Sequence, residues 1–159
     1  MTRKYMNDRW CVRCGKQSPT PYLNKYEWLI RRKERALDIG CGNGRNTRFL
    51  QELGITVDSI DMAGDFGMKR ILGKDPLPKR KYGTILANYI LMFLNRKERY
   101  NVMRDINDRA KPGAIFICEM YPAKDAYEYD FDKIVGYFTR RGWSKVRKSQ
   151  DKCILKKDE

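Results

Sequence analysis

The most constraining feature of this sequence is an apolar run that ends directly in a glycine-rich turn. Residues 36–44 read ALDIGCGNG, so the apolar residues are followed by three glycines at alternate positions. Glycines let the backbone approach a ligand closely, because no Cβ intervenes. Helical spacing then covers residues 47–53 and stops at Gly54, a favoured residue just past a helix end. The pattern predicts a strand at residues 36–39, a ligand-binding loop and a helix.

Strand and helix patterns alternate along the rest of the chain. The further predicted elements are strands at 55–62, 82–87 and 114–119, helices at 95–110 and 130–141, and a hairpin of strands at 143–149 and 152–156. Asn95 and Glu98 have the spacing of a capping box, which marks the start of the helix that follows them. We therefore predict an α/β fold, a three-layer Rossmann-like sandwich with a mostly parallel sheet and a C-terminal antiparallel hairpin.

The length of 159 residues suits a single domain over residues 1–159. Residues 1–34 are polar and basic and predict an N-terminal arm or cap with a short amphipathic helix at 23–32, whereas residues 35–159 form the predicted cofactor-binding core. No apolar run approaches the roughly 18 residues of a membrane span, and the first residues lack a signal-peptide pattern. We expect a cytoplasmic protein without a membrane partner.

Two acidic residues indicate the kind of ligand. Asp38 stands two residues before Gly40, and Arg45 occupies the place of the third glycine of a dinucleotide fingerprint, so nicotinamide dinucleotides are disfavoured. A carboxylate at a strand end suits a cationic ligand better than a pyrophosphate. Asp61 ends the next predicted strand about 20 residues beyond Gly40, where a carboxylate accepts hydrogen bonds from ribose hydroxyls.

Four segments together resemble the class I S-adenosylmethionine-dependent methyltransferases: ALDIGCGNGRNTRFL, SIDM, ILANYILMFL and AKPGAIFICE, within residues 36–157. The resemblance implies a methyltransferase with S-adenosylmethionine as its cofactor. It also implies that the loop holds the methionine part of the cofactor, that Asp61 and Met62 lie at the ribose, and that Asn88 and Tyr89 lie near the reacting methyl. The loop residues concerned are Asp38, Gly40, Cys41, Gly42 and Gly44.

The sequence departs from the family pattern between Asp61 and Tyr82. These twenty residues are too few for the helix, strand and helix that the family usually has there, so this part of the sheet is expected to be abbreviated. We place a short third strand at residues 71–74. Asp75, in the acid-then-Leu-Pro stretch that follows, is the residue that the resemblance implies at the adenine.

The methyl acceptor is not defined by any motif. The chain has no histidine, which leaves Glu119, Tyr121, Tyr89 and Asp125 as candidate general bases near the strand ends. Together with Asn88, which the resemblance implies near the reacting methyl, Tyr89 and Glu119 are the candidate catalytic residues. A net charge of +14, with basic clusters in the arm and at residues 69–81, slightly favours a nucleic-acid acceptor over a small molecule. Against nucleic acid, Asn88 is not followed by the proline pair of amino-methylating DNA enzymes. A noncatalytic nucleic-acid-binding module with the same fold is the alternative.

The five cysteines indicate neither a disulfide framework nor a complete metal site. Cys11 and Cys14 have the spacing of half a zinc knuckle, but no second pair and no histidine completes four ligands. We therefore expect no bound metal. The sequence gives no indication of the oligomeric state.

Overall fold

The computed structural model describes residues 18–64 and 66–159. Within them, seven strands form one sheet in the order β3-β2-β1-β4-β5-β7-β6. The strands are β1 (Ala36–Ile39), β2 (Val57–Asp61), β3 (Met68–Lys69), β4 (Tyr82–Asn88), β5 (Ala110–Glu119), β6 (Trp143–Lys148) and β7 (Lys152–Lys157). The helices are α2 (Pro21–Lys25), α3 (Arg45–Glu52), α4 (Arg96–Arg109) and α5 (Phe131–Thr139), with 3-10 turns η2 (Glu27–Leu29) and η3 (Leu91–Phe93).

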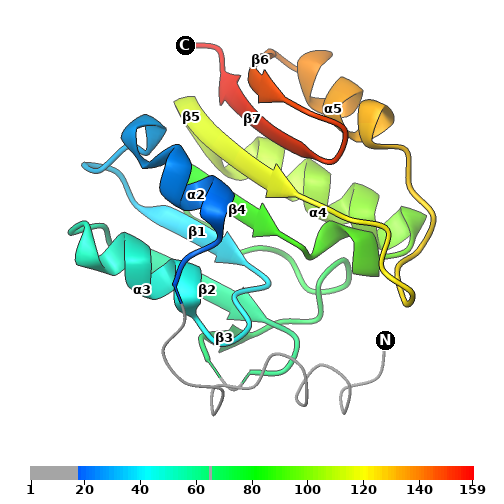
Figure 1. Ribbon diagram of the computed structural model, residues 1–159, viewed down its shortest axis with the longest axis horizontal. Helices are drawn as coiled ribbons and strands as arrows, with labels where there is room; N and C mark the ends of the chain where they lie inside the picture. Colours follow the sequence, from blue (N-terminus) through cyan, green and yellow to red (C-terminus); the bar gives the residue numbers. More distant parts are fainter. Residues whose placement is uncertain (1–17, 65) are drawn as a thin grey trace.

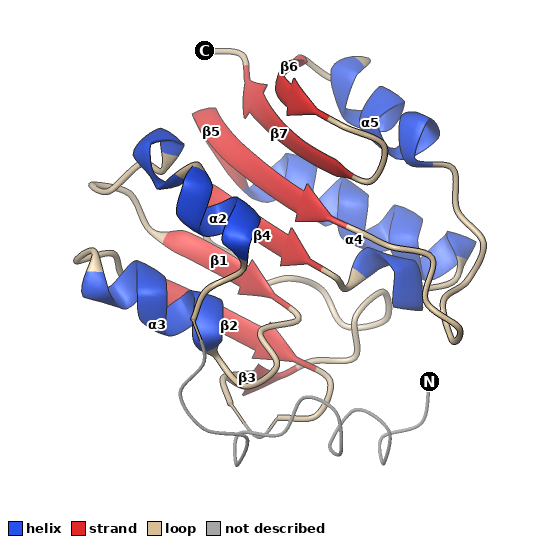
Figure 2. Ribbon diagram, viewed as in Figure 1, coloured by secondary structure: helices blue, strands red, loops and turns tan. Residues whose placement is uncertain are grey.

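The sheet is mostly parallel and lies between two layers of helices. The pairs β1–β2, β1–β4, β2–β3 and β4–β5 are parallel, whereas β7 runs antiparallel to both β5 and β6. Figures 1 and 2 show α2 and α3 on one face and α4 and α5 on the other. This arrangement confirms the predicted three-layer Rossmann-like sandwich. Among the described residues, no helix has the length and apolar character needed to cross a membrane.

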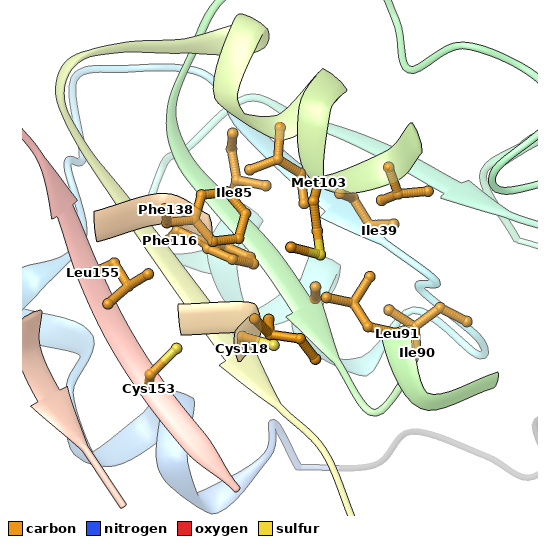
Figure 3. Packing of buried hydrophobic residues seen from close by; sticks show 14 of the residues in the cluster. Ile39, Ile85, Ile90, Leu91, Met103, Phe116, Cys118, Phe138, Cys153 and Leu155 are labelled. Atoms are coloured by element: carbon orange, nitrogen blue, oxygen red, sulfur yellow. The ribbon is translucent and has the colours of Figure 1, made fainter. Parts of the chain in front are cut away.

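Alternation along the strands divides the core between the two faces of the sheet. On β4, Ile85 and Ala87 belong to the cluster that includes α4 and α5 residues, whereas Leu86 belongs to the cluster with α3 and the N-terminal segment. In Figure 3, Phe116 of β5 lies against Phe138 of α5, with the ring centroids 5.0 Å apart. Every residue of β4 is buried, as expected for a central strand that is covered on both faces.

The predicted start of the helix at residue 95 is confirmed, whereas the helix predicted at 23–32 is wrong. The capping box is present, because the Asn95 side chain accepts from the Glu98 backbone N–H at 2.9 Å and Glu98 accepts from Asn95 N–H at 3.0 Å. The helix predicted at 23–32 is instead the short α2, which ends at Lys25, followed by η2. The chain turns there so that Leu23 and Ile30 are both buried in the same cluster, and Trp28 remains 65% exposed.

The region after β2 is abbreviated as predicted, but its third strand is not at residues 71–74. Those residues form a turn, in which Ile71 N–H donates to the Asp75 carboxylate at 2.7 Å and Asp75 N–H donates to the Ile71 carbonyl at 2.8 Å. The strand β3 comes earlier and has two residues. From Arg70 to Lys81 the chain returns to β4 without a helix.

Candidate active site

The glycine loop between β1 and α3 has a backbone that only glycine accommodates without strain. Gly40 has a φ of +70°, and a Cβ placed there would lie 2.5 Å from Cγ1 of Ile90. Gly44, at the N-cap of α3, has a φ of +83°, and its Cβ would collide with the ring of Phe66. The N–H groups of Gly40 and Cys41 donate to the Ile60 carbonyl at 2.8 and 3.0 Å, which fixes the loop to β2. The loop is therefore a preformed cradle.

A pocket opens over this loop at the carboxyl ends of the parallel strands, where ligands bind in open α/β sheets. Its walls come from the segment before α2, the glycine loop, the ends of β1, β2 and β4, and the turn after β4. The lining residues are Thr20, Asp38, Gly40, Cys41, Gly42, Asn43, Arg45, Asn46, Asp61, Asn88, Tyr89, Ile90 and Phe93. The structure thus brings most of the sequence-predicted site residues together.

Asp38 is a buried carboxylate in the floor of this pocket. It is 2% exposed, and its Oδ2 accepts from the Thr47 hydroxyl at 2.6 Å, which also lies 2.7 Å from the Ser59 hydroxyl. Burial raises the pKa of Asp38 to about 6; the Thr47 hydrogen bond opposes this rise and the charge of Asp61 adds to it. A positively charged ligand group would offset the cost of this buried charge.

Asp61 connects the glycine loop to the end of β2. Its Oδ2 accepts from Gly42 N–H at 3.0 Å and its Oδ1 accepts from Ala63 N–H at 2.8 Å. A carboxylate oxygen can accept two hydrogen bonds, so each oxygen of Asp61 can still accept one from a ligand. Asp61 is therefore suited both to shape the loop and to hold a pair of hydroxyls.

Asn88, Tyr89 and Glu119 form one hydrogen-bonded group. The Asn88 amide and the Tyr89 hydroxyl both donate to the fully buried Glu119 carboxylate, the second at 3.1 Å. Lys152 Nζ lies 3.7 Å from the same carboxylate. Burial, followed by the charge of Glu119, raises the pKa of Tyr89 to about 12, so Tyr89 stays a hydrogen-bond donor at neutral pH. Glu119, which is not itself among the lining residues, thus orients two residues of the pocket wall.

The backbone of Tyr89 is strained, with a φ of +57°, the one positive φ among the described non-glycine residues. Such conformations cost about 1–3 kcal/mol and gather at functional sites. Two polar atoms in the pocket wall are also buried without a hydrogen-bond partner among the described residues, namely Thr20 Oγ1 and Asn88 Oδ1. Buried polar atoms are normally paired, so both favour a polar ligand in this pocket.

Three of the predicted cofactor residues do not line the pocket. Gly44 caps α3 beneath it, and Met62 packs, half-buried, against the main core. Asp75 does not reach the pocket because its carboxylate accepts from Ile71 N–H in the turn near α4, where it lies with Asn101 and Asp105. The adenine role that the resemblance implies for Asp75 is therefore not supported by its position.

Sequence reasoning missed several pocket residues. Asn43, Arg45 and Asn46 lie within the glycine motif itself, so their position was available from the sequence. Thr20 carries no such signal, since it lies in the segment interpreted as a polar arm.

The half zinc knuckle of Cys11 and Cys14 falls outside the described residues. Residues 18–64 and 66–159 contain no group of three or more His, Cys, Asp or Glu suited to a metal ion.

Asp38→Asn is expected to change how stability depends on pH. Asp38 has a folded pKa of about 6 against an ordinary value of 3.8, so the folded protein takes up a proton as the pH falls through 6. This contribution stabilises the wild type progressively from pH 6 down to pH 4, by about 3 kcal/mol at roughly 1.4 kcal/mol per pH unit. The variant lacks it. Urea unfolding at pH 8 and pH 4 should show the variant losing relative stability by that amount in acid, and an unchanged difference between the two proteins would contradict it.

The sheet order, the antiparallel strand β7 and a glycine loop flanked by acid-tipped strands together define a Rossmann-like methyltransferase fold. A family model described as "Methyltransferase domain" matches residues 4–151, and the chain belongs to this family. No curated protein matches the sequence.

Solved structures agree with this family. A TehB-like SAM-dependent methyltransferase from Corynebacterium glutamicum has a TM-score of 0.73 and 16% identity, over 99% of this chain and 98% of the other. TehB from Haemophilus influenzae has a TM-score of 0.71 and 14% identity, over 99% and 67%. Magnesium protoporphyrin IX methyltransferase from Synechocystis, solved with bound SAM, has a TM-score of 0.66 and 19% identity, over 97% and 93%. At these identities the likeness concerns the fold.

Proposed function

We propose that this protein binds S-adenosylmethionine in the glycine-loop pocket and transfers its methyl group to a small-molecule acceptor. The observation that carries the proposal is the convergence of Asp38, the glycine loop and Asp61 on one pocket. Its wall also includes two polar atoms that are buried without a partner among the described residues. S-adenosylmethionine, when bound, supplies a methyl carbon activated by the adjacent sulfonium. The family membership and the SAM-bound fold neighbour support this choice of cofactor.

The residues of the pocket fit the parts of this cofactor. The Asp38 carboxylate offsets the positive charge of the methionine part, and the glycine loop allows the close approach that a Cβ would prevent. Asp61 accepts hydrogen bonds from the ribose hydroxyls. Asn88 and Tyr89 form the wall beside the reacting methyl and are positioned by Glu119. Their main contribution is to hold the reactants in line, which alone lowers a barrier substantially.

The surroundings of Tyr89 support a small-molecule acceptor over nucleic acid. The Tyr89 ring is in edge contact with Tyr121, at 5.4 Å between centroids, and the loop after Tyr121 lines a second pocket. That pocket includes four acidic side chains, Glu128, Asp130, Asp132 and Asp151, and one basic side chain, Lys148. A polyanion is repelled by such a surface. The exposed basic residues of the 69–81 segment lie instead between β3 and β4, towards the other edge of the sheet.

The acceptors of two fold neighbours agree with this preference. One protein is named for magnesium protoporphyrin IX and the other for a glycopeptide, and neither acceptor is a nucleic acid. The expectation of a nucleic-acid acceptor rests on charge alone.

Isothermal titration calorimetry with S-adenosylmethionine and S-adenosylhomocysteine tests the cofactor. We expect micromolar binding of both at one site per chain, and absence of binding contradicts the proposed function. Release of S-adenosylhomocysteine is then followed with small amines, phenols and carboxylic acids in one arm and with single-stranded RNA and DNA in the other. Turnover confined to the nucleic-acid arm, weakening steeply with salt, would reverse the choice of acceptor. Cofactor binding without turnover in either arm would favour a noncatalytic binding module.

A further inference from the structure

We propose that Thr20 is a cofactor ligand whose hydroxyl donates a hydrogen bond to the carboxylate of bound S-adenosylmethionine, an inference that rests on the proposed function. Nothing in the glycine motif or in the two acid-tipped strands assigns a role to this residue. Thr20 precedes α2, on a segment separate in sequence from the rest of the pocket wall. The proposal makes the N-terminal segment part of the cofactor site.

The first observation is an unused hydroxyl. Thr20 is fully buried, lines the pocket, and its Oγ1 has no hydrogen-bond partner among the described residues. It occupies the N-cap of α2, where a threonine side chain usually accepts from a backbone N–H of the first turn, yet no such cap hydrogen bond is present. A buried hydroxyl that neither caps its helix nor finds a protein partner is costly unless a ligand pairs with it.

The second observation is that the position of Thr20 is fixed. Its backbone N–H donates to the Asn46 side chain at 2.9 Å, a buried contact that ties the segment to the first turn of α3. Pro21 follows it and favours the extended backbone that Thr20 adopts, with φ of −57° and ψ of 139°. Thr20 is therefore fixed in the pocket wall by a contact between two segments that are far apart in sequence.

Charge decides which part of the cofactor lies there. Asp38 and Asp61 occupy the floor and suit the cationic groups and the ribose. The positively charged side of the pocket is at Arg45, in the first turn of α3, where the helix dipole also favours an anion. Thr20 lies on the same side, because its backbone N–H donates to the side chain of Asn46, the residue after Arg45. The carboxylate is the anionic group of S-adenosylmethionine, so it is the group that pairs with a hydroxyl donor there.

Calorimetry with matched ligands and variants tests the proposal. Thr20→Val removes the hydroxyl while keeping the shape, and is expected to weaken S-adenosylhomocysteine binding about tenfold. Binding of decarboxylated S-adenosylhomocysteine should not change, because the proposed partner is missing from that ligand. Thr20→Ser restores the hydroxyl and should restore most of the affinity. Without ligand, the unfolding midpoint of Thr20→Val should be equal to or above that of the wild type, because an unpaired buried hydroxyl has been removed.

Thr84→Val is the matched control, since the buried Thr84 hydroxyl accepts from Arg31 N–H at 3.3 Å and lies outside the pocket lining. It should leave both affinities unchanged. Equal binding of S-adenosylhomocysteine by Thr20→Val and wild type would overturn the proposal, as would an equal loss for both ligands. Failure of the wild type to bind S-adenosylhomocysteine is a different result, which refutes the proposed function itself.

Discussion

Asp61→Ala is expected to weaken S-adenosylhomocysteine binding by about 100-fold or more. The substitution removes the acceptors for two ribose hydroxyls, and each charge-assisted hydrogen bond contributes about 1.5–3 kcal/mol. In the wild type, Gly42 N–H and Ala63 N–H donate to this carboxylate. The substitution removes both hydrogen bonds, so the glycine loop also loses part of its support. Calorimetry measures the affinity, and circular dichroism shows whether the fold persists.

Asp58→Ala provides the control for Asp61→Ala. Asp58 lies on the same strand, near its other end, where it forms an ion pair with Arg35 at 2.9 Å and accepts from the Tyr82 hydroxyl at 2.8 Å. Its replacement should lower stability modestly and leave cofactor affinity unchanged. If Asp61→Ala bound S-adenosylhomocysteine as tightly as Asp58→Ala does, the ribose assignment would be wrong.

Gly40→Ala is expected to destabilise the protein by about 3 kcal/mol and to abolish cofactor binding. The alanine must adopt a φ of +70°, which costs about 1–2 kcal/mol, and its Cβ overlaps the side chain of Ile90 behind the loop, which adds about 1–3 kcal/mol. Relief of this overlap moves either the loop or the turn after β4, and both line the pocket. Urea unfolding and calorimetry measure the two effects.

Gly54→Ala separates backbone strain from steric overlap. Gly54 has a φ of +82°, but a Cβ there meets no atom within 4 Å. This variant should lose only the backbone term of about 1–2 kcal/mol and retain cofactor binding. Equal losses of stability in the two variants would show that the contact with Ile90 is unimportant.

Local sequence signals predicted the parts of the fold that depend on neighbouring residues. The glycine loop after β1 and the capping box at Asn95 were predictable because strand, turn and cap preferences act over a few positions. The place of β3 was not, because two exposed residues carry no periodicity and pair only where β2 already provides an edge. The early end of α2 follows from burying Leu23 and Ile30 against the same face of the sheet, which no local pattern records.

The candidate site divides in the same way. Asp38 and Asp61 were predictable from their positions at the ends of strands, and the structure places both in the pocket. Asp75 was assigned by resemblance alone, and the abbreviated segment holds it in a turn instead. Thr20 reaches the pocket only through the folding of a distant segment onto α3, which depends on a hydrogen bond between residues 26 positions apart.

The two borders of the sheet also affect how the folded chain behaves at high concentration. The border strand β3 has only two residues, so it presents very few unpaired backbone groups to another chain. The opposite border, β6, carries the exposed side chains of Lys145 and Arg147. Short borders and charged borders both discourage a further strand from adding to a sheet. The abbreviation that shortens this domain therefore also protects it against aggregation by strand addition.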